Sequence, residues 1–191
     1  MKYRCMACGY IYDEDGIKLD IIKRIKEENK KRIKEYLEYV PLASYVDDSS
    51  LIWKVKCDIA LPCATQNEIT LNAAKNLVNN NVQAVFEGSN MSSTNEAYEY
   101  FINNNVIYGP SKACNSGGVI VSAFEMSQNS MRVSFTKNQI DKMLLEKMEL
   151  IFENIYEVNK DYNFKIFDLA KGANIYAFKR LAKAMIKEGV I

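Results

Sequence analysis

The chain has 191 residues, of which 48% are hydrophobic and 26% are charged, and its formal net charge is +1. This length and composition fit one sizeable core, alone or with an appendage, in a water-soluble protein. The near-zero net charge does not favour binding to nucleic acid, which usually requires a basic surface. No apolar run approaches the ~20 residues that are needed to span a bilayer. Because the N-terminus has no apolar leader, we expect a cytoplasmic protein with no nucleic-acid or membrane partner.

The sequence contains five cysteines and no histidine. The missing histidine removes the commonest general base and every Ser-His or Cys-His nucleophile pair. An odd number of irregularly spaced cysteines gives no disulfide framework, so we expect reduced thiols. Any chemistry would therefore depend on Lys, Asp, Glu, Tyr or Cys side chains.

The N-terminal segment, residues 1–16, carries Cys5 and Cys8 at the spacing of a metal-binding knuckle. Residues 18–40 combine a broken apolar stripe with interleaved acidic and basic residues, and predict one charged helix. The alternating charge signs indicate a solvated face rather than a binding surface for an anionic partner. Residues 41–56 predict a loop with a short strand at 51–53.

Short apolar runs then alternate with helical patterns as far as residue 108. Strands are predicted at residues 57–61, 82–86 and 106–108, and helices at 69–79 and 93–103. A capping box at residues 93–96 would open the second of these helices. Strands that alternate with helices of about ten residues indicate βαβ units, so the predicted fold class is α/β with about three parallel strands.

After the third strand the pattern becomes entirely helical. One helix is predicted over residues 118–130, and a capping box at Thr136–Gln139 opens a long amphipathic helix. A last helix stops at Gly189. The predicted architecture is therefore a parallel sheet backed by C-terminal helices.

Each predicted strand ends in a polar loop, at residues 62–67, 87–90 and 109–115. Open α/β sheets bind ligands outside the carboxyl ends of their strands, so the three loops would share one ligand-facing edge. Their amides and hydroxyls orient a ligand but are poor acids and bases, and they predict binding more than bond-making. The alternative is that these side chains only cap helices.

Several strings resemble NADP-dependent glutamate dehydrogenases, in the same order and at about the same spacing. They are CDIALPCATQNE at residues 57–68, EGSNM at 87–91, SKACNSGGVIVSAFEMSQNS at 111–130, GANI at 172–175 and AMIKEGVI at 184–191. The resemblance covers almost the whole chain after Gly9, but only the C-terminal half of the family's chain. It implies a truncated form of an enzyme that interconverts glutamate with 2-oxoglutarate and ammonia by hydride transfer.

The resemblance also implies a fold organisation and a cofactor site. The sheet would be a partial Rossmann-like sheet, and the chain would divide into a knuckle-like segment (1–16), a partial dinucleotide-binding domain (17–130) and a helical region (131–191). The residues expected to lie along an NADP cofactor are Ala64, Thr65, Gln66, Asn90 and Asn115. Within this set, Asn90 would approach the nicotinamide ribose and Asn115 the nicotinamide.

For the substrate, the resemblance implies that Val119 and Ser122 contact glutamate or 2-oxoglutarate, with the Ser122 hydroxyl on the γ-carboxylate. Their i,i+3 spacing places both on one face of a helix. The alternative is that Ser122 packs inside the helical layer and bonds a carbonyl one turn back. No catalytic residue and no metal ligand is assigned, and Lys112 is expected to lie beside the cofactor or pair with a carboxylate.

The sequence departs from the family in two ways. No Gly-x-Gly-x-x-Gly occurs, and the family's substrate-binding domain with its catalytic lysine and acid is absent. The family usually has other residues at Ser89, Ser92, Cys114, Ser116, Ala123, Lys171, Tyr176 and Ala177. We therefore expect either an enzyme part that needs a front-half polypeptide, or a non-catalytic remnant that binds a nucleotide or a partner protein, and a chain that self-associates.

A second resemblance covers the N-terminal segment. Residues 1–13, MKYRCMACGYIYD, resemble the first knuckle of rubredoxin, an iron-binding electron carrier. Such a site needs four thiolates from two knuckles, and the second knuckle is missing. We expect no complete metal site.

Overall fold

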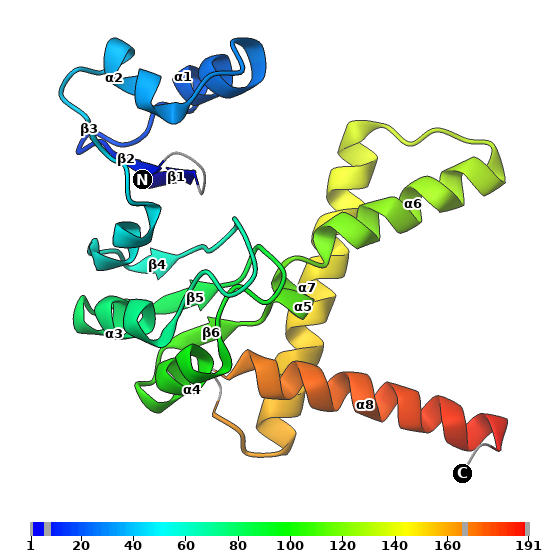
Figure 1. Ribbon diagram of the computed structural model, residues 1–191. Coiled ribbons are helices and arrows are strands. Elements are labelled where there is room, and N and C mark those ends of the chain that lie inside the picture. The colour runs from blue at the N-terminus through cyan, green and yellow to red at the C-terminus, as the bar shows by residue number, and fades with distance from the viewer. Residues whose placement is uncertain (1, 6–8, 166–167, 190–191) are drawn as a thin grey trace.

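The computed structural model describes residues 2–5, 9–165 and 168–189. These residues form two three-stranded sheets and a set of C-terminal helices (Figure 1). One sheet belongs to an N-terminal lobe, and the other is the centre of the chain. The Cys5–Cys8 knuckle lies partly outside the described residues.

The N-terminal lobe, residues 2–5 and 9–46, contains an antiparallel sheet. Its strands are β1 (Lys2–Cys5), β2 (Gly9–Tyr12) and β3 (Ser44–Val46), with β2 in the middle. Its helical turns are α1 (Leu19–Lys23), the π-helical η1 (Arg24–Glu28), the 3-10 turn η2 (Ile33–Glu35) and α2 (Tyr36–Tyr39). The turns cover one small apolar core.

The prediction of one helix over residues 18–40 is wrong. The chain is helical from Leu19 to Glu28, passes through a left-handed conformation at Lys30 (φ 54°) and resumes at Ile33. A straight helix of this length would span ~34 Å and could not place both of its ends on one small core. The break folds the second half back, so that Ile25 and Tyr36 are both fully buried in the same cluster.

The lobe's core joins residues on both sides of the expected division at 16/17. Ile11 on β2 packs in the same cluster as Ile17 and Tyr36. The buried carboxylate of Asp13 accepts a 2.7 Å hydrogen bond from the Tyr36 hydroxyl, which itself accepts one from the Lys18 N–H at 2.9 Å. Residues 9–46 therefore fold around a shared centre.

The central sheet confirms the α/β prediction. Its strands are β4 (Ile59–Ala60), β5 (Ala84–Phe86) and β6 (Ile107–Gly109), all parallel and in the order β4-β5-β6. Helices α3 (Leu71–Asn79) and α4 (Asn95–Asn103) provide the two crossovers and pack against each other over a common core. Short parallel strands with intervening amphipathic helices are what the alternating pattern predicts.

Two local predictions around this sheet are wrong. Residues 51–53 lie in a 3-10 helix, η3 (Ser49–Lys54), because Asp48 caps it by accepting from the Ser50 N–H at 2.9 Å, and the turn buries Trp53. The cap of α4 is Thr94 rather than Ser93, and its hydroxyl accepts from the Ala97 N–H at 3.3 Å.

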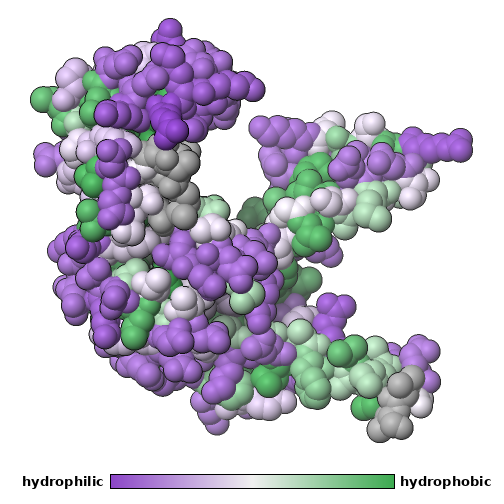
Figure 2. All heavy atoms as spheres, viewed as in Figure 1, coloured by the Kyte–Doolittle hydropathy of each residue, from purple (hydrophilic) through white to green (hydrophobic). Residues whose placement is uncertain are grey.

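The C-terminal region is helical, as predicted. It consists of α5 (Ser111–Cys114), α6 (Gly117–Met131), α7 (Lys137–Asp161) and α8 (Leu169–Glu188). The Thr136–Gln139 capping box is confirmed, and Gly189 ends α8 in a left-handed conformation (φ 72°). Helices α6 and α8 project from α7 toward the same side (Figure 1), and apolar residues lie exposed along both (Figure 2).

Candidate functional site

The loops that follow the three parallel strands are bound to one another; we call residues 62–68, 87–94 and 110–115 the loop cluster. The Pro62 carbonyl oxygen accepts hydrogen bonds from the N–H groups of Gly88 and Ser89, at 2.9 and 3.0 Å. These bonds join the first loop to the second. The Met91 N–H donates to the Ser111 hydroxyl at 3.2 Å, which joins the second to the third. The carboxyl edge of the sheet is therefore one continuous polar surface.

Glu87 holds the second and third loops together. Its carboxylate accepts from the Ser93 N–H at 2.6 Å through one oxygen and from the Ser111 N–H at 2.9 Å through the other. The residue is only 3% exposed. A buried carboxylate that binds two backbone donors is a rigid anchor, because charge-assisted hydrogen bonds are about twice as strong as neutral ones. Sequence reasoning missed this role, although an acid directly after a buried strand was the available signal.

Glu68 shapes the first loop in a similar way. One of its oxygens accepts from the N–H groups of Ala64 and Thr65 at 2.9 and 3.3 Å and from the Ser89 hydroxyl at 3.3 Å. The two backbone donors are therefore already occupied by a carboxylate. A phosphate at this loop would have to displace a negative group, so the loop suits a hydroxyl-bearing or uncharged part of a ligand better.

Ser89 and Ser92, two of the departures from the family, act as a pair. Their hydroxyl oxygens are 2.5 Å apart, and Ser92 is fully buried. The Ser92 hydroxyl also lies 3.3 Å from the Pro62 carbonyl oxygen. The substitutions therefore add hydrogen bonds inside the loop cluster.

The cysteines of the loop cluster are poor nucleophiles. Burial, with a smaller contribution from the Glu87 charge, raises the pKa of the Cys114 thiol to about 11. Burial, followed by the Glu68 charge, also raises the pKa of Cys63. Because the thiolate is the reactive form, neither side chain suits covalent chemistry near neutral pH.

The residues predicted to bind the cofactor lie on this surface. Ala64, Thr65, Gln66 and Asn90 are exposed, and Asn115 is half-buried at the C-terminal end of α5. All five residues are therefore at least partly accessible to solvent, and so to a ligand, on the loop cluster. Their role in binding stays a prediction.

Val119 and Ser122 both lie exposed on α6, and Val119 is 69% exposed. The hydroxyls of Ser127 and Ser130 donate to carbonyl oxygens one turn back, at 2.9 and 3.0 Å. Within the described part of the chain Ser122 makes no such bond, so its hydroxyl is available to a ligand.

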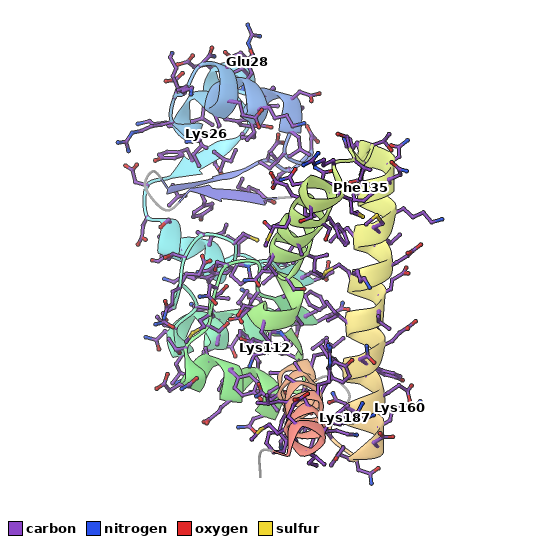
Figure 3. All side chains as sticks on the ribbon, turned by 90° about the vertical axis from the view of Figure 1, so that its right-hand side faces the viewer. Lys26, Glu28, Lys112, Phe135, Lys160 and Lys187 are labelled. Carbon is purple, nitrogen blue, oxygen red and sulfur yellow. The ribbon has the colours of Figure 1, made fainter. Side chains whose placement is uncertain are left out.

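Lys112 connects α5 to the last helix. Its ammonium group donates to the Asn174 side-chain oxygen at 2.5 Å, and Figure 3 shows it beside α8. This contact orients the start of α8 against the loop cluster. This hydrogen bond gives Lys112 a structural role, and no catalytic role is needed to explain its position.

The described residues contain neither a candidate metal-binding cluster nor a helix that could span a membrane. No group of three or more His, Cys, Asp and Glu side chains in this part of the chain could hold a metal ion. No helix within residues 2–5, 9–165 and 168–189 is both long and apolar enough to cross a membrane.

The strand order, the crossover helices and the polar loops at the carboxyl edge together define an α/β protein with an open parallel sheet. The sequence profile of the glutamate/leucine/phenylalanine/valine dehydrogenases matches residues 6–189, and the chain belongs to this family. The fold agrees: a crystal structure of Plasmodium falciparum glutamate dehydrogenase superimposes with a TM-score of 0.88 at 41% identity, over 97% of this chain and 40% of that one.

Curated relatives give the same picture. The NADP-specific glutamate dehydrogenase of Helicobacter pylori J99 is 40% identical over 95% of this chain and 42% of its own length. A glutamate dehydrogenase of Bacteroides thetaiotaomicron is 43% identical, and an NAD-specific one of Porphyromonas gingivalis is 40% identical. The chain spans about two fifths of the length of these relatives.

Proposed function

We propose that this chain is the C-terminal part of a glutamate dehydrogenase, and that it supplies the surface facing the nicotinamide and the amino-acid substrate. The observation that supports the proposal best is the loop cluster, whose second and third loops Glu87 joins into one polar surface. In the proposed reaction, glutamate, NADP and water give 2-oxoglutarate, ammonium, NADPH and a released proton.

In this proposal the chain binds and orients, and does not transfer protons. The side-chain amides of Asn90 and Asn115 position the ribose and the nicotinamide, which takes up the hydride when the cofactor is bound. The Ser122 hydroxyl donates to the γ-carboxylate, and Val119 packs along the substrate methylenes. These groups are exposed or half-buried and none is a strong acid or base, which suits orientation rather than proton transfer.

We propose NADP as the cofactor, on the likeness of the three loop strings to the NADP-dependent enzymes. Relatives of both specificities match this chain at similar identity, so a direct comparison of the two nucleotides is the test. We also propose a cytoplasmic location, because Cys63 and Cys114 are free thiols, as is usual in a reducing compartment.

The competing proposal is a non-catalytic module that binds a nucleotide or a partner protein. It is supported by the raised pKa values of the Cys63 and Cys114 thiols and by the engagement of Lys112 with Asn174. These leave the loop cluster without an activated nucleophile or base. Under this alternative, nucleotide binds but no turnover appears even when the missing polypeptide is added.

The experiment measures NADPH absorbance with the purified chain, alone and after co-expression with the part of the Helicobacter pylori enzyme that this chain does not match. We expect no turnover above about 1 per second from the chain alone, and ordinary enzyme rates from the complex. Ser122→Ala should raise the KM for glutamate roughly 10- to 100-fold, the loss of one hydrogen bond to a charged group.

Ser130→Ala is the matched control, because the Ser130 hydroxyl lies on the same helix but bonds its own backbone. Equal effects of the two substitutions would refute the substrate role of Ser122. Turnover by the chain alone would refute the need for a second polypeptide.

A further inference from the structure

The C-terminal half of α8 extends away from the rest of the chain. The helix packs against α7 and β6 near its start, where Gly172 and Ala173 are buried. Residues 177–189 are exposed, except for half-buried Ala182, and Figure 1 shows this part of α8 projecting away from α7 and from the central sheet. About three turns of helix are therefore open to solvent on most sides.

One side of this half carries an apolar stripe, which we call the α8 stripe. Its members are Phe178, Leu181, Ala182, Met185 and Ile186, and all but the alanine are at least 42% exposed. Their i, i+3, i+4, i+7, i+8 spacing places them on one face of the helix. Figure 2 shows apolar side chains along this part of α8. An exposed apolar face of this kind marks a site of interaction.

Two basic side chains lie on the other side of the helix. Lys183 follows Gly172, which packs against α7, by about three turns, and Lys187 lies one turn further along the same line. Both are therefore separated from any surface that the α8 stripe contacts by roughly the 10 Å width of a helix. Attraction to an anionic lipid surface falls off over about this distance, so the arrangement favours an apolar protein partner over a membrane.

The α8 stripe is complementary to itself in an antiparallel pair. With a two-fold axis between Leu181 and Ala182, Phe178 of one copy lies at the level of Met185 of the second copy, and Leu181 lies at the level of Ala182. Each level then combines a bulky side chain with a smaller or more flexible one, which allows the side chains of two helices to interdigitate. Methionine sulfur also makes favourable contacts with aromatic rings. No charged side chain lies within this seam.

The shape of the chain leaves room for such a pair. The two sheets lie on the side of α7 that is opposite to the projecting half of α8 (Figure 1). In an antiparallel pair, the sheets of the second copy therefore lie beyond the far end of the first copy's α8. The two bodies are kept apart, and the helices can approach each other along the α8 stripe.

We propose that two copies of this chain associate through antiparallel pairing of their α8 stripes, centred between Leu181 and Ala182. Each copy contributes one short helical face, so the contact belongs to the small, transient class of interfaces. The inference goes beyond the proposed function and does not depend on it, because no residue of the loop cluster takes part.

The test measures self-association of the purified full chain by sedimentation equilibrium. We expect a monomer–dimer equilibrium with a Kd of tens of micromolar. Phe178→Lys and Met185→Glu each put a charge in the apolar seam and should each weaken dimerisation at least about tenfold. An equimolar mixture of the two variants should recover most of the lost affinity, because the antiparallel register sets the introduced ammonium group opposite the introduced carboxylate.

Lys183→Glu is the matched control, because it changes a charge on the same helix but outside the α8 stripe. It should change the Kd by less than about threefold, and circular dichroism checks that every variant keeps its helices. The inference is overturned if the chain stays monomeric, if the control weakens dimerisation as much as the stripe variants, or if the mixture recovers no affinity.

Two other outcomes would also overturn the inference. Recovery in a mixture of Phe178→Lys and Phe178→Glu, without recovery in the first mixture, would show a parallel pair and refute the antiparallel register. A chain that is monomeric in solution but sediments with phosphatidylserine vesicles would show that α8 binds lipid rather than a second copy.

Discussion

Glu87 is the residue on which the candidate site depends most. Its two oxygens bind backbone donors from two different loops, at the start of the segment leading to α4 and at the start of α5. Removing either carboxylate oxygen leaves a buried backbone N–H without a hydrogen-bond partner. The resulting loss of folding free energy is larger than the net stabilisation that the hydrogen bond itself provides. Buried Glu87 therefore positions both loops of the candidate site without contacting a ligand itself.

We expect Glu87→Gln to lower the free energy of unfolding by about 2 kcal/mol, because an amide keeps only one acceptor oxygen for two N–H donors. Urea denaturation followed by circular dichroism measures the change. Glu99→Gln, at an exposed position of α4, is the control and should change stability by less than about 0.5 kcal/mol. Equal stabilities of the two variants would show that Glu87 is not the anchor.

Asp13 gives the N-terminal lobe a pH dependence. The hydrogen bond from the Tyr36 hydroxyl, foremost, lowers the pKa of Asp13 below its usual value of 3.8. A lowered folded-state pKa stabilises the lobe above the unfolded pKa near 4, and this stability is lost as the pH falls through the folded value. The Lys18 ammonium group, 3.3 Å away, favours the ionised form as well.

Tyr36→Phe should therefore raise the Asp13 pKa toward its usual value and destabilise the lobe at pH 7. The carboxyl carbon of Asp13, followed by NMR titration, measures the first effect. Thermal unfolding at pH 7 and pH 3 measures the second, and the difference between the wild-type and variant proteins should shrink at the lower pH. A difference that does not depend on pH would mean that Tyr36 acts only through packing.

At the scale of elements, α7 and α8 pack closely against each other around Gly172. Gly172 is buried there, and a methyl group at this position would lie 2.8 Å from the Ile155 carbonyl oxygen and would overlap the Asn159 side chain. Only glycine lets the two backbones approach this closely. The glycine of the family-like string at 172–175 therefore has a packing reason.

Gly172→Ala should destabilise the chain by about 1–3 kcal/mol through overpacking. Gly118→Ala on α6 is the matched control, because a methyl group there meets no atom within 4 Å. It should stabilise α6 by up to about 1 kcal/mol, since alanine is the better helix former. Both values come from urea denaturation, and a loss of stability in the Gly118 variant would contradict the open surroundings of α6.

For the whole molecule, the exposed apolar residues of the projecting helices predict association. Phe178, Leu181 and Met185 lie on one face of α8 and are 65%, 59% and 42% exposed. Helix α6 has no buried residue along its fifteen. Apolar surfaces of this kind mark interaction sites or aggregation sites.

We expect the isolated chain to self-associate at tens of micromolar and to bind a hydrophobic dye, as measured by light scattering and fluorescence. A Phe178→Ser/Leu181→Ser double variant should shift the chain toward monomer, whereas Leu42→Ser, at an exposed position on the lobe, should not. A compact monomer that does not bind the dye would contradict this expectation.

Much of the fold could be predicted from the chain because its signals are local. The alternation of buried strands with helices of about ten residues and the Thr136–Gln139 capping box each depend on neighbouring residues. The same holds for the glycine stop at residue 189. The strings that carry the family resemblance are likewise contiguous, so they were readable without coordinates.

Other features were decided only by tertiary structure. The break at Lys30 lets Ile25 and Tyr36 share one core, and this burial overrides the helical propensity of the segment. The 3-10 turn at Trp53 buries its ring, and this burial overrides the local strand propensity. Glu87 became an anchor because two loops far apart in sequence bring their N–H groups to it. The sequence by itself determined the family and the order of the elements, because these depend on short-range patterns. Tertiary structure alone decided which polar groups meet and which sheet edge stays open, because both depend on contacts between distant segments.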